Sequence, residues 1–158
     1  MRQCGSCTLC CKVLGVGELN KPKGQWCPHC SIGVGCGIYK QRPTECINFD
    51  CSWLLGKVPE DLKPNMTNVV LADLQLDVER ANPGIKLDDP VIIVYSDPDT
   101  PDAYKTGKMQ EYLDSLLKQG IALIIVRGDE KLLMKHGSVK NDETFTKSSI
   151  TLTANTSE

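Results

Sequence analysis

The hydrophobic positions of residues 58–137 follow the periods of a small α/β unit. Residues 68–78 partly alternate and are rich in β-branched side chains, which predicts a strand, and Asn82-Pro83-Gly84 predicts a turn. Residues 91–95 and 121–126 are continuous apolar runs, the pattern of buried strands. Between the two runs, apolar residues keep i, i+3, i+4, i+7, i+8 spacing and predict one apolar helical face: Met109, Tyr112, Leu113, Leu116 and Leu117.

The ends of these elements carry their own signals. Thr100 and Pro101 suit the N-cap and first position of the helix, and Gly120 suits its end. Strand, helix and strand of these lengths predict a right-handed βαβ unit. Gly128-Asp129 fits a two-residue hairpin turn into an antiparallel strand at residues 131–135.

The remaining chain lacks such periods. Residues 12–26 read as loop with a short extended piece at 13–16, and residues 56–65 as a linker with a short helix at 59–63. Residues 138–158 are polar and predict a frayed tail or an edge strand. We therefore expect an α+β protein in three parts: a cysteine-rich, metal-knit irregular segment (1–57), a small mixed-sheet unit packed on it that contains a βαβ and a hairpin (58–137), and a polar tail (138–158).

Cysteine is confined to the first third of the chain. All nine cysteines lie between positions 4 and 51, and Cys4-Gly-Ser-Cys7-Thr-Leu-Cys10-Cys11 opens the segment. A Cys-x-x-Cys step lets two thiolates reach one ion from a tight turn, which Gly5 eases. Cys10 and Cys11 are adjacent, so their side chains diverge and would most easily serve different ions. Eight thiolates would make two four-sulfur sites for zinc or for iron–sulfur clusters, and any of the nine could be the spare.

The charge of residues 1–57 and the expected cytoplasmic location agree with a metal-binding segment. Residues 1–57 hold seven Lys and Arg against three acids, whereas residues 58–158 hold eleven against seventeen. The basic excess suits counter-charges for thiolates, and the net charge of -2 disfavours nucleic-acid binding. No signal-peptide pattern or membrane-length apolar run is visible, which predicts a cytoplasmic protein without membrane contact. Thiols stay reduced there, so dense cysteine favours metal over disulfides.

The same segment resembles a known family. Four motifs follow one another in a fixed order: Cys-x-x-Cys-x-x-Cys-Cys, Trp26-Cys-Pro-His29, Gly35-Cys-Gly-Ile-Tyr39 with Arg42-Pro43, and Phe49-x-Cys51. This order resembles the YkgJ-type family of cysteine-rich bacterial proteins, which are described as zinc- or iron-chelating domains. The resemblance covers roughly residues 4–55 and implies metal binding without a settled reaction. It implies eight metal ligands: Cys4, Cys7, Cys10, Cys11, Cys27, Cys36, Cys46 and Cys51. Cys30 lies where the family pattern has an apolar residue.

Several neighbours of these cysteines have two interpretations. His29 lies between Cys27 and Cys30 and is either a substitute ligand or, as we favour, a supporting or exposed residue. Cys30 is an alternative ligand, a redox-active thiol or a plain buried residue. Pro43 would fix a turn that returns Cys46 toward Cys36, and Arg42 would donate to cluster sulfurs or to a carbonyl. The aromatic residues would shield the sites from water: Trp26, Tyr39, Phe49 and Trp53.

The loop at residues 96–102 follows the first strand of the βαβ unit, where open α/β sheets bind ligands. Its three carboxylates would repel phosphate and suit the positive end of the following helix dipole, with a hard cation between Asp97 and Asp99 as the alternative. The leading hypothesis is a binding or accessory module with two zinc or iron sites and room for a protein partner. An iron–sulfur enzyme in redox or modification chemistry and a zinc module for nucleic acid are the competing hypotheses.

Overall fold

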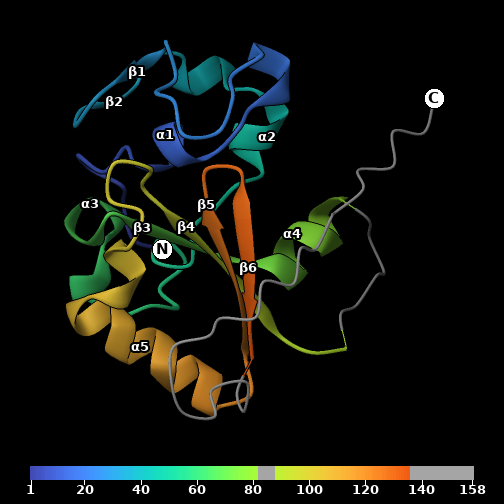
Figure 1. Ribbon diagram of the computed structural model, residues 1–158. Helices are drawn as coiled ribbons and strands as arrows, with labels where there is room; N and C mark the ends of the chain where they lie inside the picture. The colour runs from blue at the N-terminus through green and yellow to red at the C-terminus, as the bar shows by residue number, and fades with distance from the viewer. Residues whose placement is uncertain (82–87, 136–158) are drawn as a thin grey trace.

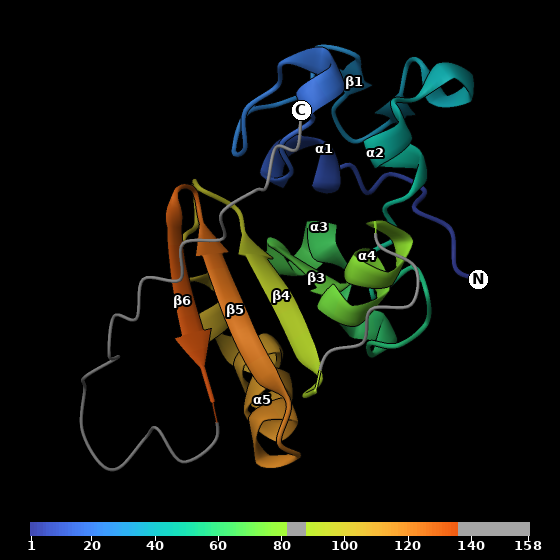
Figure 2. The ribbon, with the colours of Figure 1, turned by 90° about the vertical axis from the view of Figure 1, so that its right-hand side faces the viewer.

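A computed structural model describes residues 1–81 and 88–135 of the chain. The cysteine-rich segment lies at one end of a four-stranded sheet (Figure 1). Two helices, α4 (Leu74–Ala81) and α5 (Gly107–Lys118), lie on opposite faces of this sheet (Figures 1 and 2). The expected α+β class is confirmed. The predicted turn at 82–84, the tail at 138–158 and His136 lie outside the described residues.

The sheet has the order β3-β4-β5-β6 and mixed directions. Its strands are β3 (Val69–Asp73), β4 (Val91–Ser96), β5 (Ala122–Arg127) and β6 (Glu130–Met134). β4 and β5 pair in parallel with α5 between them in the chain, which is the expected βαβ connection. The hairpin turn is also confirmed, since Arg127 pairs with Glu130 and Gly128 has a φ of +57°.

Helix α5 begins later than the sequence predicts. Its N-cap is Thr106 rather than Thr100, and residues Ala103–Lys105 form a separate 3-10 turn, η4. Gly107 has a φ of +54°, which no continuous right-handed helix from Pro101 could contain. The predicted apolar face is correct, because Met109, Leu113, Leu116 and Leu117 are buried and Tyr112 packs beside them. The predicted end is correct as well: Gly120 has a φ of +84° and donates to the Leu117 carbonyl at 3.0 Å.

The strand predicted over residues 68–78 is wrong in its second half. β3 ends at Asp73, and the chain turns directly into α4. The Asp73 carboxylate accepts the backbone N–H of Gln75 at 3.0 Å and of Leu76 at 3.4 Å. These two bonds satisfy donors that a helix start leaves free, so Asp73 caps α4 and stops the strand.

One hydrophobic core joins α5, the linker and one face of the sheet. Leu123, Ile125 and Val94 are fully buried at its centre. Trp53, Val58 and Leu62 from the linker region pack into the same core. The linker contains the 3-10 turn η3 (Glu60–Leu62) at the predicted short helix and a further turn, α3 (Pro64–Thr67). The residues that follow the last cysteine therefore belong to the core of the sheet unit.

The cysteine-rich segment consists of short elements. The sequence predicts an extended piece at 13–16, but Cys10 to Val13 instead forms one helical turn, and Val16 makes a single bridge to Lys21. Glycine at positions 33 and 35 allows a small hairpin where no strand was expected. The elements are α1 (Cys10–Val13), η1 (Gly17–Leu19), β1 (Cys30–Ser31), β2 (Gly35–Cys36), η2 (Tyr39–Gln41) and α2 (Thr44–Ile47).

This segment is packed directly on the sheet. Leu9 and Val13 share a second buried cluster with Val70 of β3. At the edge of β3, the Ser52 N–H donates to the Leu71 carbonyl at 2.7 Å. Figure 2 shows β4 and β5 pointing toward the segment, which lies beyond their carboxyl ends. Within residues 1–81 and 88–135, no helix combines the length and apolar character that crossing a membrane requires.

Candidate metal centre

Two Cys-x-x-Cys steps form tight turns, as expected. The Cys7 N–H donates to the Cys4 carbonyl and the Cys30 N–H to the Cys27 carbonyl, both at 3.0 Å. Gly5 has a φ of +56°, which eases the first turn because glycine lacks a Cβ. All nine cysteines are free thiols; Cys4 is exposed, and the other eight are partly exposed. The thiols are thus available as ligands and fall into two groups.

The first group joins the start of the chain to the beginning of the linker. Cys51 interacts electrostatically with Cys4 and Cys7, although more than forty positions separate them in the sequence. Burial raises the pKa of the Cys51 thiol, whereas the Leu54 N–H, 3.4 Å from its sulfur, acts in the opposite direction. Backbone N–H groups that point at sulfur stabilise a thiolate. The net effect is a raised pKa, so Cys51 is a neutral thiol near pH 7 that a bound cation would ionise beside Cys4 and Cys7.

The second group is built by the small hairpin and α2 around α1. The Cys27 N–H donates to the Cys11 carbonyl at 3.0 Å, and Cys30 on β1 lies opposite Cys36 on β2. The Cys46 N–H donates to the Pro43 carbonyl at 3.0 Å, which supports the predicted turn, and Cys46 interacts with Cys11, Cys27 and Cys36. This group consists of Cys11, Cys27, Cys30, Cys36 and Cys46, and Cys10 contacts Cys11 from the neighbouring position in α1.

The thiols of the second group suppress one another's ionisation. Contact with the Cys10 thiol, followed by burial, raises the pKa of Cys11 far above its ordinary value. Burial and then the nearby Cys11 thiol raise the pKa of Cys30 to about 11. These groups are therefore neutral thiols near pH 7. A divalent cation reverses this effect, because a coordinated thiol is deprotonated.

A buried lysine lies against the second group. Lys21 is 6% exposed, and its ammonium donates to the carbonyls of Lys12 and Pro22, each at 3.2 Å, and of Leu14. Burial lowers the pKa of Lys21, and the groups that would act on its ammonium if ionised include four thiols: Cys27, Cys11, Cys46 and Cys10. Among the described residues no carboxylate forms an ion pair with Lys21.

The cysteine thiols are donors of the type that zinc and iron bind in proteins. The buried Lys21 ammonium has the charge needed to balance a thiolate site. Four thiolates around a divalent ion carry a net charge of about −2, which a buried cation offsets. The side chains do not yet converge: in the described part of the chain, no group of three or more Cys, His, Asp or Glu is arranged to hold one ion. Ligation would therefore require rotation of cysteine side chains within each group.

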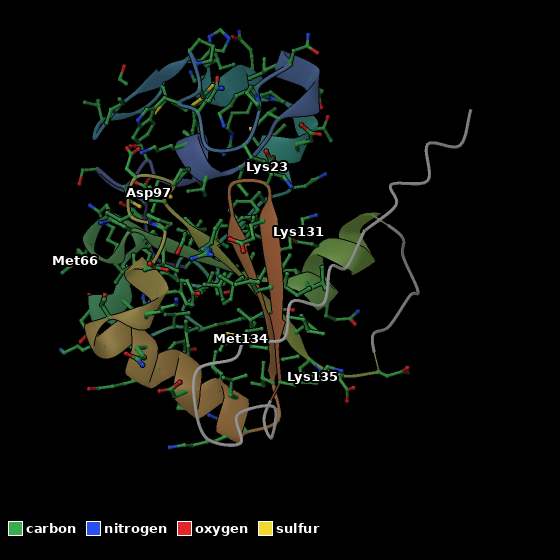
Figure 3. All side chains as sticks on the ribbon, viewed as in Figure 1. Lys23, Met66, Asp97, Lys131, Met134 and Lys135 are labelled. Atoms are coloured by element: carbon green, nitrogen blue, oxygen red, sulfur yellow. The ribbon has the colours of Figure 1, made fainter. Side chains whose placement is uncertain are left out.

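The acidic loop after β4 binds a lysine of the cysteine-rich segment. Lys12, which follows Cys11 in α1, forms ion pairs with Asp97 at 2.7 Å and Asp99 at 2.5 Å. Figure 3 labels Asp97 in the loop after β4, at the end of the sheet unit nearest the cysteine-rich segment. Asp102 pairs instead with Arg127 at 2.8 Å and Lys105 at 3.3 Å. The loop leads into the 3-10 turn η4, whose N-cap is Asp102, and α5 begins only at Gly107, so the expected role of the three carboxylates at the dipole of that helix is wrong. The lysine ammonium already fills the place that a hard cation between Asp97 and Asp99 would need.

Backbone packing reinforces this contact. A Cβ on Gly24 would lie 2.9 Å from the Pro98 ring, and Gly24 has a φ of +77°. Only glycine allows the loop before Cys27 to approach Pro98 this closely. The loop that leads to the second thiol group thus packs against the loop that follows β4.

The other predicted site residues lie in different surroundings. His29 is exposed, and Arg42 stacks on Tyr39 at 3.8 Å, with its Nε lacking a hydrogen-bond partner among the described residues. Tyr39 is 62% exposed and therefore covers little, contrary to its expected shielding role. Trp53 is buried in the core, and Phe49 packs against the buried cluster of Leu9, Val13 and Val70, as Cys7 and Cys51 do. Sequence reasoning missed Lys12 and Lys21, whose only signal was the basic excess of this segment.

A cavity of about 550 Å³ lies beside the loop after β4, between the linker turns and the start of α5. An ion pair of 2.5 Å between Lys108 and Asp61 lies at its wall. The described residues that line it include Leu62, Thr67, Thr100 and Met109, and no cysteine is among them. The cavity is therefore separate from the thiol groups.

Comparison with known proteins gives no relative: no family model, no curated protein and no solved structure matches the chain. The resemblance to the YkgJ-type family accordingly stays a prediction from the cysteine pattern.

Proposed function

We propose that this chain is a metal-binding protein whose cysteines hold two zinc or iron ions or clusters, and that it acts as a binding or accessory module in a reducing, cytoplasmic compartment. The first group would use Cys4, Cys7 and Cys51. Cys10 would be its fourth ligand, because the adjacent Cys10 and Cys11 would most easily serve different ions. The second would use Cys11, Cys27, Cys36 and Cys46, with Cys30 beside them. This division agrees with the ligands that the YkgJ-type resemblance implies, and it assigns the adjacent Cys10 and Cys11 to different ions.

The observation that carries the proposal is the position of Lys21. A buried ammonium without a carboxylate partner in the described part of the chain is costly unless negative charge forms near it. Among the described residues, the neighbours of Lys21 that can supply that charge include the second-group thiols Cys27, Cys11 and Cys46, and a metal ion is what ionises them at neutral pH. The bound ion would supply structural order to a segment that has little apolar core of its own.

Anaerobic purification followed by metal analysis and a visible spectrum tests the proposal. Colourless protein with about two zinc per chain supports thiolate zinc sites. Brown protein with iron and sulfide supports clusters on the same ligands. Protein that binds neither zinc nor iron under reducing conditions would overturn the proposal.

An iron–sulfur enzyme is the second candidate, and the placement of the segment favours it. The cysteine-rich segment lies beyond the carboxyl ends of the parallel strands β4 and β5, where open α/β sheets bind ligands. An enzyme of this kind needs an iron with an exchangeable position. Cyanide added to the reduced iron-loaded protein would then change its electron paramagnetic resonance spectrum, whereas an unchanged spectrum supports the binding module.

A further inference from the structure

The cavity beside the loop after β4 is built by three segments of the chain. Asp61 and Met66 come from the linker turns, Thr100 from the loop, and Lys108 from the start of α5. The loop follows the carboxyl end of β4, the place at which open α/β sheets bind ligands. The volume of about 550 Å³ lies within the range of about 300–1,000 Å³ that small-molecule sites have. Position and size therefore suit a small molecule.

Two buried hydroxyls below this cavity have no hydrogen-bond partner among the described residues. They belong to Ser96 and Tyr104, which are 2% and 3% exposed. Val94, two positions before Ser96 in β4, belongs to the core on the α5 face, so the Ser96 side chain points to the same face. Met109 and Tyr104 belong to this core as well, and Met109 lines the cavity. Unpaired buried hydroxyls are rare in native proteins, and a polar occupant with the water that it orders would supply partners on this side.

The wall of the cavity carries two opposite charges side by side. The Lys108 ammonium lies 2.5 Å from an Asp61 carboxylate oxygen, and both side chains are exposed to solvent. Exposed ion pairs contribute little to stability, so a ligand can separate these two charges at little cost.

The start of α5 adds hydrogen-bond donors beside Lys108. The first bond within the helix runs from the Gln110 N–H to the Thr106 carbonyl at 3.3 Å, so the three N–H groups before it have no partner inside the helix. Thr106 does not cap them, because its hydroxyl donates to the Ala103 carbonyl at 2.9 Å. Thr106, Lys108 and Met109 line the cavity, so free donors and the positive end of the helix dipole favour an anionic group there.

We propose that this cavity binds the zwitterion of an α-amino acid with an apolar side chain. The ligand carboxylate contacts the Lys108 ammonium and the free N–H groups of α5, and the ligand ammonium contacts the Asp61 carboxylate. Both charged groups of an α-amino acid are attached to one carbon, which matches the short distance between Lys108 and Asp61. The ligand side chain then lies beside Met109 and Met66, which is exposed at the edge of the cavity (Figure 3). Methionine is flexible and contacts aromatic rings favourably, so phenylalanine is a suitable probe.

Ligands with a single kind of charge fit this wall less well. A phosphate ion would meet the carboxylate of Asp61, and Asp102 lines the same cavity. An amine without a carboxylate would displace Lys108 from Asp61 and leave the N–H groups of α5 without an anion. A carboxylate without an ammonium would take Lys108 and leave Asp61 unpaired. No cysteine lines the cavity, so the proposal does not depend on the proposed metal binding.

Isothermal titration calorimetry of the full-length chain tests the proposal with three probes. They are L-phenylalanine, phenethylamine, which lacks the carboxylate, and hydrocinnamate, which lacks the ammonium. Phenylalanine should bind at least about tenfold more tightly than either analogue, because each analogue loses one charged contact. In amide NMR spectra, phenylalanine should shift the signals of Asn68, Thr100 and Lys108, which line the cavity.

Two substitutions of exposed residues should change the preference among the probes. Asp61→Asn frees Lys108 and removes the partner of the ligand ammonium, so hydrocinnamate should bind at least as tightly as phenylalanine. Lys108→Met should favour phenethylamine in the same way. Lys118→Met, at the other end of α5 and outside the cavity, is the matched control and should keep the wild-type affinities.

Absence of phenylalanine binding at millimolar concentration would overturn the proposal. Binding of either analogue as tightly as phenylalanine by the wild type, or NMR shifts confined to residues 4–51, would overturn it as well. An unchanged order of affinities in both Asp61→Asn and Lys108→Met would exclude the two residues as the contacts of the zwitterion. A chain that binds phenylalanine at this cavity and holds no metal would contradict the proposed function alone.

Discussion

The Lys12 ammonium lies 2.7 Å from an Asp97 carboxylate oxygen, and both side chains are nearly buried, at 8% and 11% exposure. The contact joins α1, which carries Cys10 and Cys11, to the loop after β4. Asp97 is fixed in turn, because its carboxylate accepts the Asp99 N–H at 2.9 Å and its own N–H donates to the Asn68 carbonyl at 2.9 Å. The position of the second thiol group is therefore tied to the carboxyl end of a sheet strand.

Replacing Asp97 should destabilise the protein. Breaking a buried ion pair by removing one partner costs about 3–5 kcal/mol, and because the exposed Asp99 still neutralises Lys12, we expect a loss of about 2–3 kcal/mol for Asp97→Asn. Urea unfolding followed by circular dichroism measures it. Asp102→Asn, in the same loop but with an exposed ion pair, is the control and should leave the midpoint unchanged. Equal effects of the two variants would contradict the importance of the buried contact.

The same ion pair should weaken at high pH. Burial lowers the pKa of Lys12, but its hydrogen bonds to Asp97 and Asp99 outweigh burial and raise it above the ordinary value. The folded protein then binds more protons than the unfolded chain, so the stabilisation is fully present below about pH 10.4 and is lost as pH rises through the folded pKa. The stability difference between wild type and Lys12→Met/Asp97→Leu should be constant from pH 7 to 9 and shift against the wild type at pH 11. Cysteine titration is common to both proteins and cancels; a constant difference at all pH values would refute the prediction.

Loss of one ligand should lower the metal content of the protein. Cys27→Ser or Cys46→Ser should lose about half of the bound metal or all of it, and Cys51→Ser should deplete the first group. Cys30→Ser should keep full metal content, because eight thiolates fill two four-coordinate sites. Metal analysis of the purified variants measures this, with circular dichroism of the sheet as a folding check. A metal deficit in Cys30→Ser would make Cys30 a ligand and leave another cysteine as the spare.

The buried lysine should matter for ion binding. Lys21→Met removes the charge that offsets the second group, and loss of such a supporting residue typically lowers metal affinity about 10- to 100-fold. Competition with a chromogenic zinc chelator gives the affinity. Lys23→Met is the matched control, because Lys23 is exposed and lies two positions away in the same loop. If both variants bind zinc like the wild type, Lys21 has no such role.

Removal of metal should loosen one part of the protein before the other. Ligation free energy is folding free energy in a segment whose order depends on an ion, whereas the sheet has its own buried core. Hydrogen exchange with mass spectrometry after chelation should show lost protection over residues 4–51 and retained protection in β4 and β5. Continued protection of residues 4–51 would argue that packing on the sheet unit, such as that of Leu9 and Val13 on Val70, holds the segment in place without metal.

Sequence periodicity predicted the sheet unit well because its signals are local. Apolar runs place β4 and β5, and the i, i+3, i+4 pattern places the buried face of α5. The starts of the helices were harder to predict. For α5, Pro101 looks like a good first residue, but ion pairs in the loop and the positive φ of Gly107 place the start of the helix later. For α4, the β-branched run before it concealed the capping role of Asp73.

The clustering of cysteines was predictable from the sequence, whereas the residues that pack around them were not; metal ligation itself stays a prediction. Cysteine spacing indicates a metal site by itself, since Cys-x-x-Cys turns form locally. The Lys12 ion pair with Asp97 spans two distant parts of the chain, and the thiol neighbours of Lys21 come from three separate turns. Such contacts depend on how the parts pack, so no local pattern reveals them.

The contact between Gly24 and Pro98 has an evolutionary consequence. A side chain at position 24 would meet the Pro98 ring at 2.9 Å and would strain a backbone with a φ of +77°. Substitution at either position is therefore constrained by the other, across the boundary between the cysteine-rich segment and the sheet unit. Homologues that keep this packing should retain glycine at position 24 and proline at position 98 together. The pair could therefore identify related chains whose cysteine spacing has diverged.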